Sequence, residues 1–189
     1  MGSSWITACS TGKRLEKRHD DVAHVLSTHV QRARLKVSED VAIMRDGRAN
    51  RPRPADLRIR NFVNGKDAAI DVTIVAPLQK KYLSRAAAQI GVAAFKAEKL
   101  KRRKYSDQCR QHDVIFFPVA GETYGGWGAS ARDVFERIIA KEAAVLERPM
   151  GPVRRQLYCD LAISIARNAA RAILERLPEN VVDHPLPDA

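Results

Sequence analysis

The chain contains 189 residues, of which 45% are hydrophobic, and this combination favours one domain with a hydrophobic core and excludes global disorder. The formal net charge of +11 and the pI near 10.0 favour a polyanionic partner, although a ribosomal or membrane-surface protein would carry the same charge. The sequence has no signal-peptide pattern and no run of about 18 apolar residues, so we expect a soluble, intracellular protein without a membrane span.

Hydrophobic periodicity divides the chain into alternating helices and strands. In chain order, the expected elements are a helix over 13–34, strands over 37–44, 53–59 and 68–75, a helix over 84–111, a strand over 114–119 buried on both faces, and helices over 130–146 and 153–177. This order predicts an α/β fold, in which helices flank a central mixed sheet and two helices lie at the C-terminal end. We expect one domain over 13–177, preceded by an irregular segment over 1–12 and followed by an extended tail over 178–189.

Two of the expected strands each carry an aspartate among apolar residues, Asp56 in the first and Asp71 in the second. An Asn64-Gly65 pair lies between the strands, and this dipeptide favours a tight hairpin turn. If the strands pair across the turn, the two carboxylates reach a common point, as in a divalent-metal site for phosphodiester hydrolysis. Glu122, which follows the buried strand, is a further candidate for the same site.

A structural role for the two aspartates, in a turn cap or a salt bridge, is the alternative interpretation, and it is favoured for the pair taken alone. Asp71 is harder to explain in this way, because Ile70 and Val72 flank it on an expected sheet strand. A buried carboxylate without a partner is costly, so a functional role for Asp71 remains open.

The long helix expected after the second strand carries a stripe of small residues that ends in Lys101. We expect the stripe to pack on the sheet, so that Lys101 reaches the strand ends near the acids. A lysine near a scissile phosphate stabilises the developing negative charge. In a two-carboxylate site this lysine usually follows the second acid by two residues, and that position here is Thr73. Basic residues on the other helix faces are candidates for phosphate contacts, with a solvated charged surface as an equal alternative: Lys96, Lys99, Arg102 and Arg103.

Several short motifs, in this order, resemble the restriction-like endonuclease domain of site-specific non-LTR retrotransposons, which belongs to the PD-(D/E)XK nuclease superfamily. The similarity runs from about residue 12 to residue 176. The motifs lie at 18–22, 53–56, 69–73, 98–101 with 104–105, 117–118 and 122–128. The chain departs from the family pattern at two points. Ala55 separates Pro54 from Asp56, and Cys9 stands without the cysteine-histidine knuckle that often precedes the domain.

The resemblance implies a metal-dependent DNA endonuclease that uses Mg²⁺ or Mn²⁺ to nick target DNA for reverse transcription. It implies DNA, with RNA–DNA intermediates, as the substrate, a reverse transcriptase domain in cis or trans as the partner, and a nuclear location. By motif position, Asp56 and Asp71 are the metal ligands and Lys101 the catalytic lysine. The remaining implied residues comprise Lys104 and Tyr105 in the catalytic site, Asp20 beside it, and Arg18, His19 and Arg53 as nucleic-acid contacts. Two alternatives stay open: a catalytically inactive nucleic-acid-binding module on the same fold and, less favoured, a basic protein-interaction domain.

Overall fold

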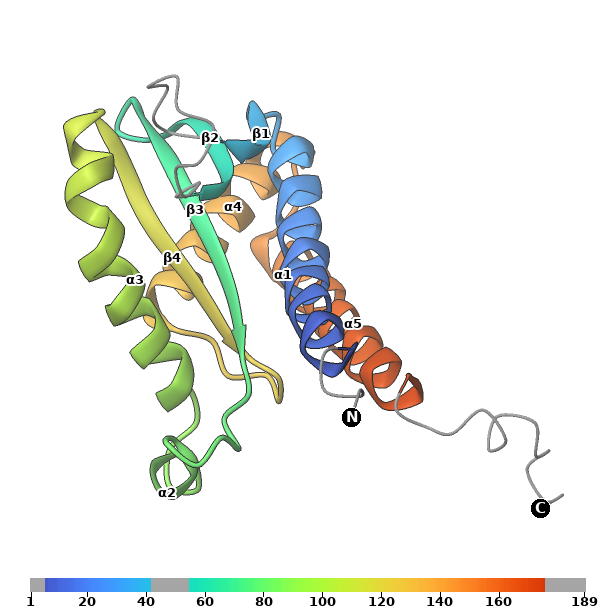
Figure 1. Ribbon diagram of the computed structural model, residues 1–189. Helices are drawn as coiled ribbons and strands as arrows, with labels where there is room; N and C mark the ends of the chain where they lie inside the picture. The colour runs from blue at the N-terminus through green and yellow to red at the C-terminus, as the bar shows by residue number, and fades with distance from the viewer. Residues whose placement is uncertain (1–5, 42–54, 176–189) are drawn as a thin grey trace, which may run out of the picture.

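The computed structural model describes residues 6–41 and 55–175, with side chains from His19 onward. The elements are α1 (Ile6–Arg32), β1 (Val37–Val41), β2 (Ala55–Val63), β3 (Lys66–Val75), α2 (Leu83–Ala86), α3 (Val92–Gln111), β4 (Val114–Glu122), α4 (Ala129–Leu146) and α5 (Met150–Leu174). The strands form one sheet in the order β1-β2-β3-β4, in which β3 and β4 are parallel and the other two pairs antiparallel. Helix α3 covers one face of the sheet, while α1, α4 and α5 lie on the other (Figure 1). The expected mixed sheet between helices is confirmed.

The hairpin between β2 and β3 follows the sequence prediction closely. Asn64 and Gly65 connect the strands with φ angles of 50° and 81°, which a tight primed turn requires and which asparagine and glycine tolerate. Leu57 lies opposite Ile70 in the antiparallel register. The register shifts between Ile59 and Val63, so a bulge lies close to the turn, away from the two aspartates.

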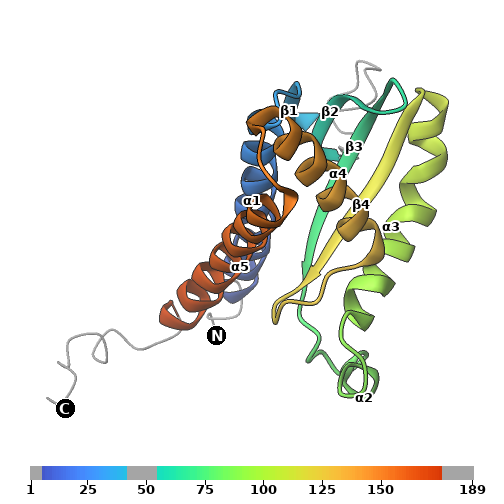
Figure 2. The ribbon, with the colours of Figure 1, turned by 180° about the vertical axis from the view of Figure 1, so that it is seen from behind.

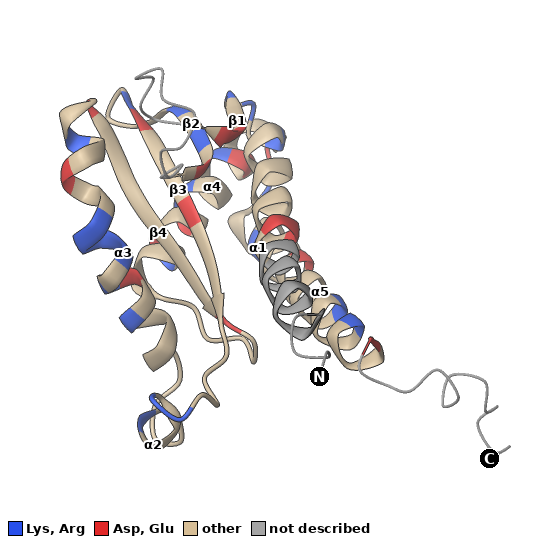
Figure 3. Ribbon diagram, in the orientation of Figure 1, with Lys and Arg blue, Asp and Glu red and all other residues tan. Residues whose placement is uncertain are grey.

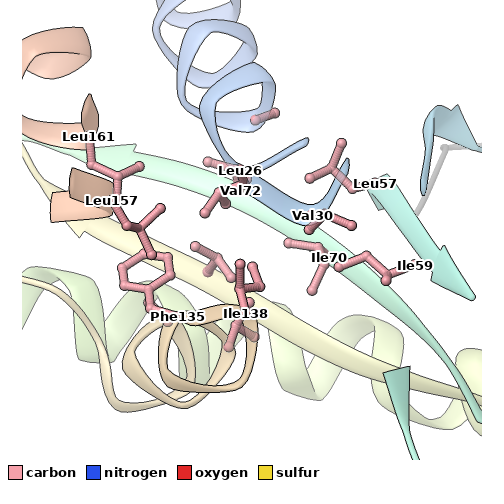
Figure 4. Close-up of a cluster of buried hydrophobic side chains, with 14 of the residues drawn as sticks. Leu26, Val30, Leu57, Ile59, Ile70, Val72, Phe135, Ile138, Leu157 and Leu161 are labelled. Carbon is pink, nitrogen blue, oxygen red and sulfur yellow. The ribbon is translucent and has the colours of Figure 1, made fainter. Parts of the chain in front are cut away.

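The main hydrophobic core lies between the sheet and the three helices on its α1 side. Alternate residues of β2 and β3, including Leu57 and Ile70, point into it and are fully buried. Leu26 from α1, Ile138 from α4 and Leu157 from α5 close over them (Figure 4). Figure 2 shows this side, with α4 lying across the sheet and α5 packed against α1 and α4. The intervening residues of β3 therefore face α3, and Asp71 is one of them.

The strand at the opposite end of the sheet from β1 is buried on both faces, as expected. In β4, Phe116 belongs to a buried cluster with Tyr105 of α3, while Val119 belongs to the main core. Helices α3 and α4 lie against β4 from its two sides, so its unbroken apolar run has a partner on each face.

Several predicted element boundaries need correction. Strands β2 and β4 extend to Val63 and Glu122, beyond the expected ends at residues 59 and 119. Helix α1 begins at Ile6, so residues 6–12 are helical instead of irregular; their Ser, Thr and Gly residues lower helix propensity by less than about 1 kcal/mol each. The single helix expected over 84–111 is divided into α2 and α3, because Gly91 adopts a φ of 86°, outside the helical range. Helix α5 begins at Met150 instead of residue 153, because Pro152 is tolerated in a first helical turn. Residues 42–44 of the first expected strand and the tail over 178–189 lie outside the described residues.

Candidate active site at the β2–β3 hairpin

The hairpin places Asp56 next to Asp71. Leu57 pairs with Ile70, so the antiparallel register, continued by one residue, sets the two aspartates opposite each other. Asp56 Oδ2 accepts a hydrogen bond of 2.6 Å from the backbone N–H of Val72, which ties this carboxylate to β3. Asp71 is buried, with 6% of its surface exposed. The predicted pairing of the two strands that carry the aspartates is confirmed.

Lys101 reaches this pair from α3, as its place on the helix predicts. Its Nζ lies 3.0 Å from Asp71 Oδ1 and 2.8 Å from Oδ2. Ala97 and Ala94, one and two turns earlier on the same helix, pack against Ala120 of β4. Their short side chains let α3 approach the sheet closely, so the Lys101 side chain is long enough to reach Asp71.

Burial is the largest influence on the Asp71 carboxyl. It raises the pKa of Asp71, because desolvation penalises the charged form, while the hydrogen bond from Lys101 acts in the opposite direction. Lys101 Nζ is the partner of both oxygens of this buried carboxylate, at 3.0 Å from Oδ1 and 2.8 Å from Oδ2. Carboxylate oxygens are also the ligands that a hard cation prefers.

His19 of α1 completes the cluster from the other side of the sheet. Its Nε2 lies 2.8 Å from Asp56 Oδ1, and its Nδ1 lies 2.9 Å from Oδ1 of the exposed Asp20. The hydrogen bond with Asp56, helped by the charges of both aspartates, raises the pKa of His19 to about 9. At neutral pH the imidazole is therefore a cation bound to Asp56, so His19 is part of the acidic cluster.

This ion pair predicts a measurable pH dependence of stability in the metal-free protein. The folded-state pKa of His19, about 9, exceeds its ordinary value of 6.5, so the contribution to the free energy of unfolding is complete below pH 6.5 and disappears as the pH rises through 9. Because His19 is partly solvent-exposed, we expect this contribution to be about 1–2 kcal/mol. Urea unfolding in EDTA measures it as the difference between wild type and His19→Gln. That difference is expected at about pH 6 and lost at about pH 10, and a constant difference contradicts the assignment.

A pocket of about 640 Å³ opens beside the cluster. Thr73, Lys101, Lys104 and Tyr105 all line it, together with His19. The Nζ atoms of Lys101 and Lys104 lie 5.7 Å and 4.9 Å from the centre of the Tyr105 ring, within the range of a cation–π contact. The structure therefore brings together the sequence-predicted residues of the hairpin and of the second half of α3.

Glu122 does not enter the site, and this expectation was wrong. Its buried carboxylate instead accepts hydrogen bonds from the first backbone N–H groups of α3, at 3.0 Å from Gly91, 2.8 Å from Ala93 and 3.3 Å from Ala94. A helix N-terminus leaves such N–H groups without partners and favours negative charge, which explains the placement. Glu98 acts in the same way at the start of α4, where it accepts hydrogen bonds from Ser130 and Ala131 at 3.1 Å and 3.0 Å.

The other basic candidates lie apart from the acids. Lys99, Arg102 and Arg103 are exposed on α3, and Figure 3 shows basic positions in blue along this helix. Lys96 Nζ lies 5.2 Å from the centre of the Tyr82 ring. The side chain of Arg18 and all of Arg53 fall outside the described residues.

Sequence reasoning missed the roles of Glu98 and Glu122 because both carboxylates cap helices that lie elsewhere in the chain. A local capping box places its acid three residues after the N-cap, whereas Glu122 follows the start of α3 by about 30 residues. No short-range pattern marks such a contact. Within the described ranges, no set of three or more His, Cys, Asp or Glu residues is arranged to hold a metal ion.

Fold and site together define a class: a basic mixed α/β protein in which two adjacent strand carboxylates meet a lysine from the following helix. Comparison with protein-family models and with curated proteins gives no match to the chain. In the part of the chain that the structure describes, no helix combines the length and apolar character needed to cross a membrane. The cluster itself is therefore the basis for a functional assignment.

Proposed function

We propose that the protein is a metal-dependent DNA endonuclease of the PD-(D/E)XK type. One observation carries the proposal: Asp56 and Asp71 lie on paired strands, and Lys101 from the following helix contacts Asp71. An ordinary salt bridge between α3 and β3 needs one acid, and the second carboxylate beside it is the feature that a phosphodiester-cleaving site requires.

The residues of the cluster fit a hard divalent cation. Asp71 Oδ2 lies 2.8 Å from Lys101 Nζ and Asp56 Oδ1 lies 2.8 Å from His19 Nε2, so a cation bound by these two oxygens would replace the basic side chains as their partner. Carboxylate oxygens suit Mg²⁺ or Mn²⁺ better than softer metals. A bound cation of this kind supplies Lewis-acid stabilisation of the phosphate and lowers the pKa of a bound water.

The side chains of the chain have separate tasks in this proposal. Lys101 places a positive charge beside the scissile phosphate and stabilises the negative charge that develops during the reaction. Asp71 orients Lys101 through contacts with both carboxylate oxygens. The exposed cations of α3, Lys99, Arg102 and Arg103, contact the phosphates on either side and contribute affinity without sequence specificity.

The resemblance to retroelement endonuclease domains suggests the biological setting. In that setting the enzyme nicks nuclear target DNA, and a reverse transcriptase domain in cis or in trans extends the exposed end. The net charge of +11 supports a nucleic-acid partner and does not distinguish DNA from an RNA–DNA intermediate.

A second candidate function is a nucleic-acid-binding module without catalysis. It is favoured by the pairing of both acids with bases, Asp56 with His19 and Asp71 with Lys101, which neutralises the cluster without any metal. Under this alternative the same basic surface binds phosphates, and binding weakens with salt in the same way.

Cleavage of DNA separates the two functions. Supercoiled plasmid incubated with the protein and Mg²⁺ or Mn²⁺ is expected to convert to the nicked form, whereas excess EDTA is expected to stop conversion, because the two carboxylates alone do not activate water. Agarose electrophoresis measures the initial rate. Salt-sensitive DNA binding without nicking in either metal would establish the binding module instead.

A further inference from the structure

The pocket beside the acidic cluster is lined by apolar side chains and lysines, and the cutting reaction alone does not require such a pocket. Its floor is the last part of β3 with the residues that follow, and its wall is the stripe of α3 from Ala97 to Tyr105. The loop before α2 closes one end, and His19 stands at the other. At about 640 Å³ it has the size of a small-molecule site.

The surfaces of this pocket combine apolar groups with positive charge. Val75, Ala76, Leu100 and the ring of Tyr82 supply apolar lining. Its cations are Lys81, Lys101, Lys104 and the protonated His19, and the described lining includes no aspartate or glutamate. An apolar body joined to an anion complements these walls, and a nucleotide combines a flat base with a phosphate in this way.

We propose that this pocket receives the base of an unpaired nucleotide beside the scissile phosphate, so that the substrate is DNA with a single-stranded segment, such as a flap, a fork or a free strand. A paired base is stacked inside the duplex and cannot enter a side pocket without being extruded, which costs a few kcal/mol. A base that is already unpaired enters without this cost. The inference rests on the proposed nuclease function, because that function assigns the neighbouring cluster to phosphate chemistry.

Leu100 offers a test that spares the fold and the acidic cluster. It lines the pocket, yet 62% of its surface is exposed, so Leu100→Glu adds a negative charge at the pocket without disturbing the core. Phe95 is the matched control, because it is an exposed apolar residue of the same helix, 60% exposed, and is not part of the pocket lining. Phe95→Glu makes the same change of charge outside the pocket.

The experiment is a fluorescence-anisotropy titration in EDTA, where no cleavage occurs, with a labelled single strand of about 12 nucleotides and the same sequence as a duplex. Wild type is expected to bind the single strand at least about fivefold more tightly than the duplex. Leu100→Glu is expected to weaken single-strand binding about tenfold and duplex binding less than about twofold, whereas Phe95→Glu weakens both equally.

Equal affinity of wild type for the single strand and the duplex overturns the inference. Equal effects of Leu100→Glu and Phe95→Glu also overturn it. Either result is expected if the pocket binds another ligand, such as an acidic peptide. The nuclease function is judged separately by metal-dependent cutting, measured on both supercoiled plasmid and a forked DNA with a single-stranded arm. Cutting without strand preference removes only the pocket assignment. Strand preference lost in Leu100→Glu, without any cutting, removes only the nuclease and leaves an unpaired-strand binding site.

Discussion

Replacing Asp71 with asparagine is expected to lower the rate of metal-dependent plasmid nicking by on the order of 10²–10³. Asparagine keeps the size of the side chain but removes the negative charge of the carboxylate. That charge would hold a divalent cation, and both carboxylate oxygens contact Lys101. Because Asp71 is buried, water does not replace the lost carboxylate. Initial rates at equal concentrations of folded protein, with folding checked by thermal unfolding, measure the effect.

Asp67 provides the control on the same strand. Its carboxylate pairs with Arg58, at 2.8 Å from Nη2, and takes no part in the cluster. Asp67→Asn is expected to change the nicking rate by less than about twofold, because Asp67 contacts Arg58 and not the cluster. Loss of this partly exposed ion pair also has little effect on the stability of the fold. Equal losses in both variants would point to a general effect on the strand, and an unchanged rate in Asp71→Asn would remove the assigned site.

The hairpin was predictable from sequence because each of its features is local. Alternation fixes which residues share a face, and the Asn64-Gly65 turn fixes the register, so the proximity of Asp56 and Asp71 follows from residues that lie close together in the chain. Lys101 was predictable in the same way, since a stripe of small residues marks the face of a helix that approaches a sheet.

The remainder of the site depends on contacts that no local pattern encodes. The histidine that binds Asp56 comes from α1, which crosses the opposite face of the sheet, and only the tertiary arrangement sets its ring beside the strand. The capping of α3 by Glu122 likewise joins residues about 30 positions apart. Its consequence for function is indirect, because it fixes where α3 begins and therefore which residues of the helix face the acids.

The division of the long helix at Gly91 has a related physical cause. Helical periodicity continues through residues 84–111 in the sequence, and glycine within a helix costs only about 1 kcal/mol. The carboxylate of Glu122 accepts the N–H groups of Gly91, Ala93 and Ala94, which would otherwise bond to carbonyls of the preceding turn. Tertiary hydrogen bonds thus outweigh local propensity, and a new helix starts at the carboxylate.

Replacing Lys101 with methionine is expected to lower nicking about 100-fold, because the site loses its positive charge beside the phosphate. The same change removes the contact that opposes the effect of burial on Asp71, so the pKa of this carboxyl rises further. A carboxyl with a raised pKa carries its charge only at higher pH. The residual activity of Lys101→Met is therefore expected to increase with pH, and the acidic limb of its pH–rate profile to lie at higher pH than in wild type.

Two comparisons separate the charge of Lys101 from its position. Lys101→Arg keeps the charge and is expected to restore part of the rate and the wild-type acidic limb. Lys104→Met removes an exposed charge one turn further along α3, and because solvent screens that charge, it is expected to reduce the rate less than about tenfold and leave the acidic limb in place. If both methionine variants lose activity equally and neither profile shifts, the helix acts only as a basic phosphate-binding surface, and Lys101 has no special role at Asp71.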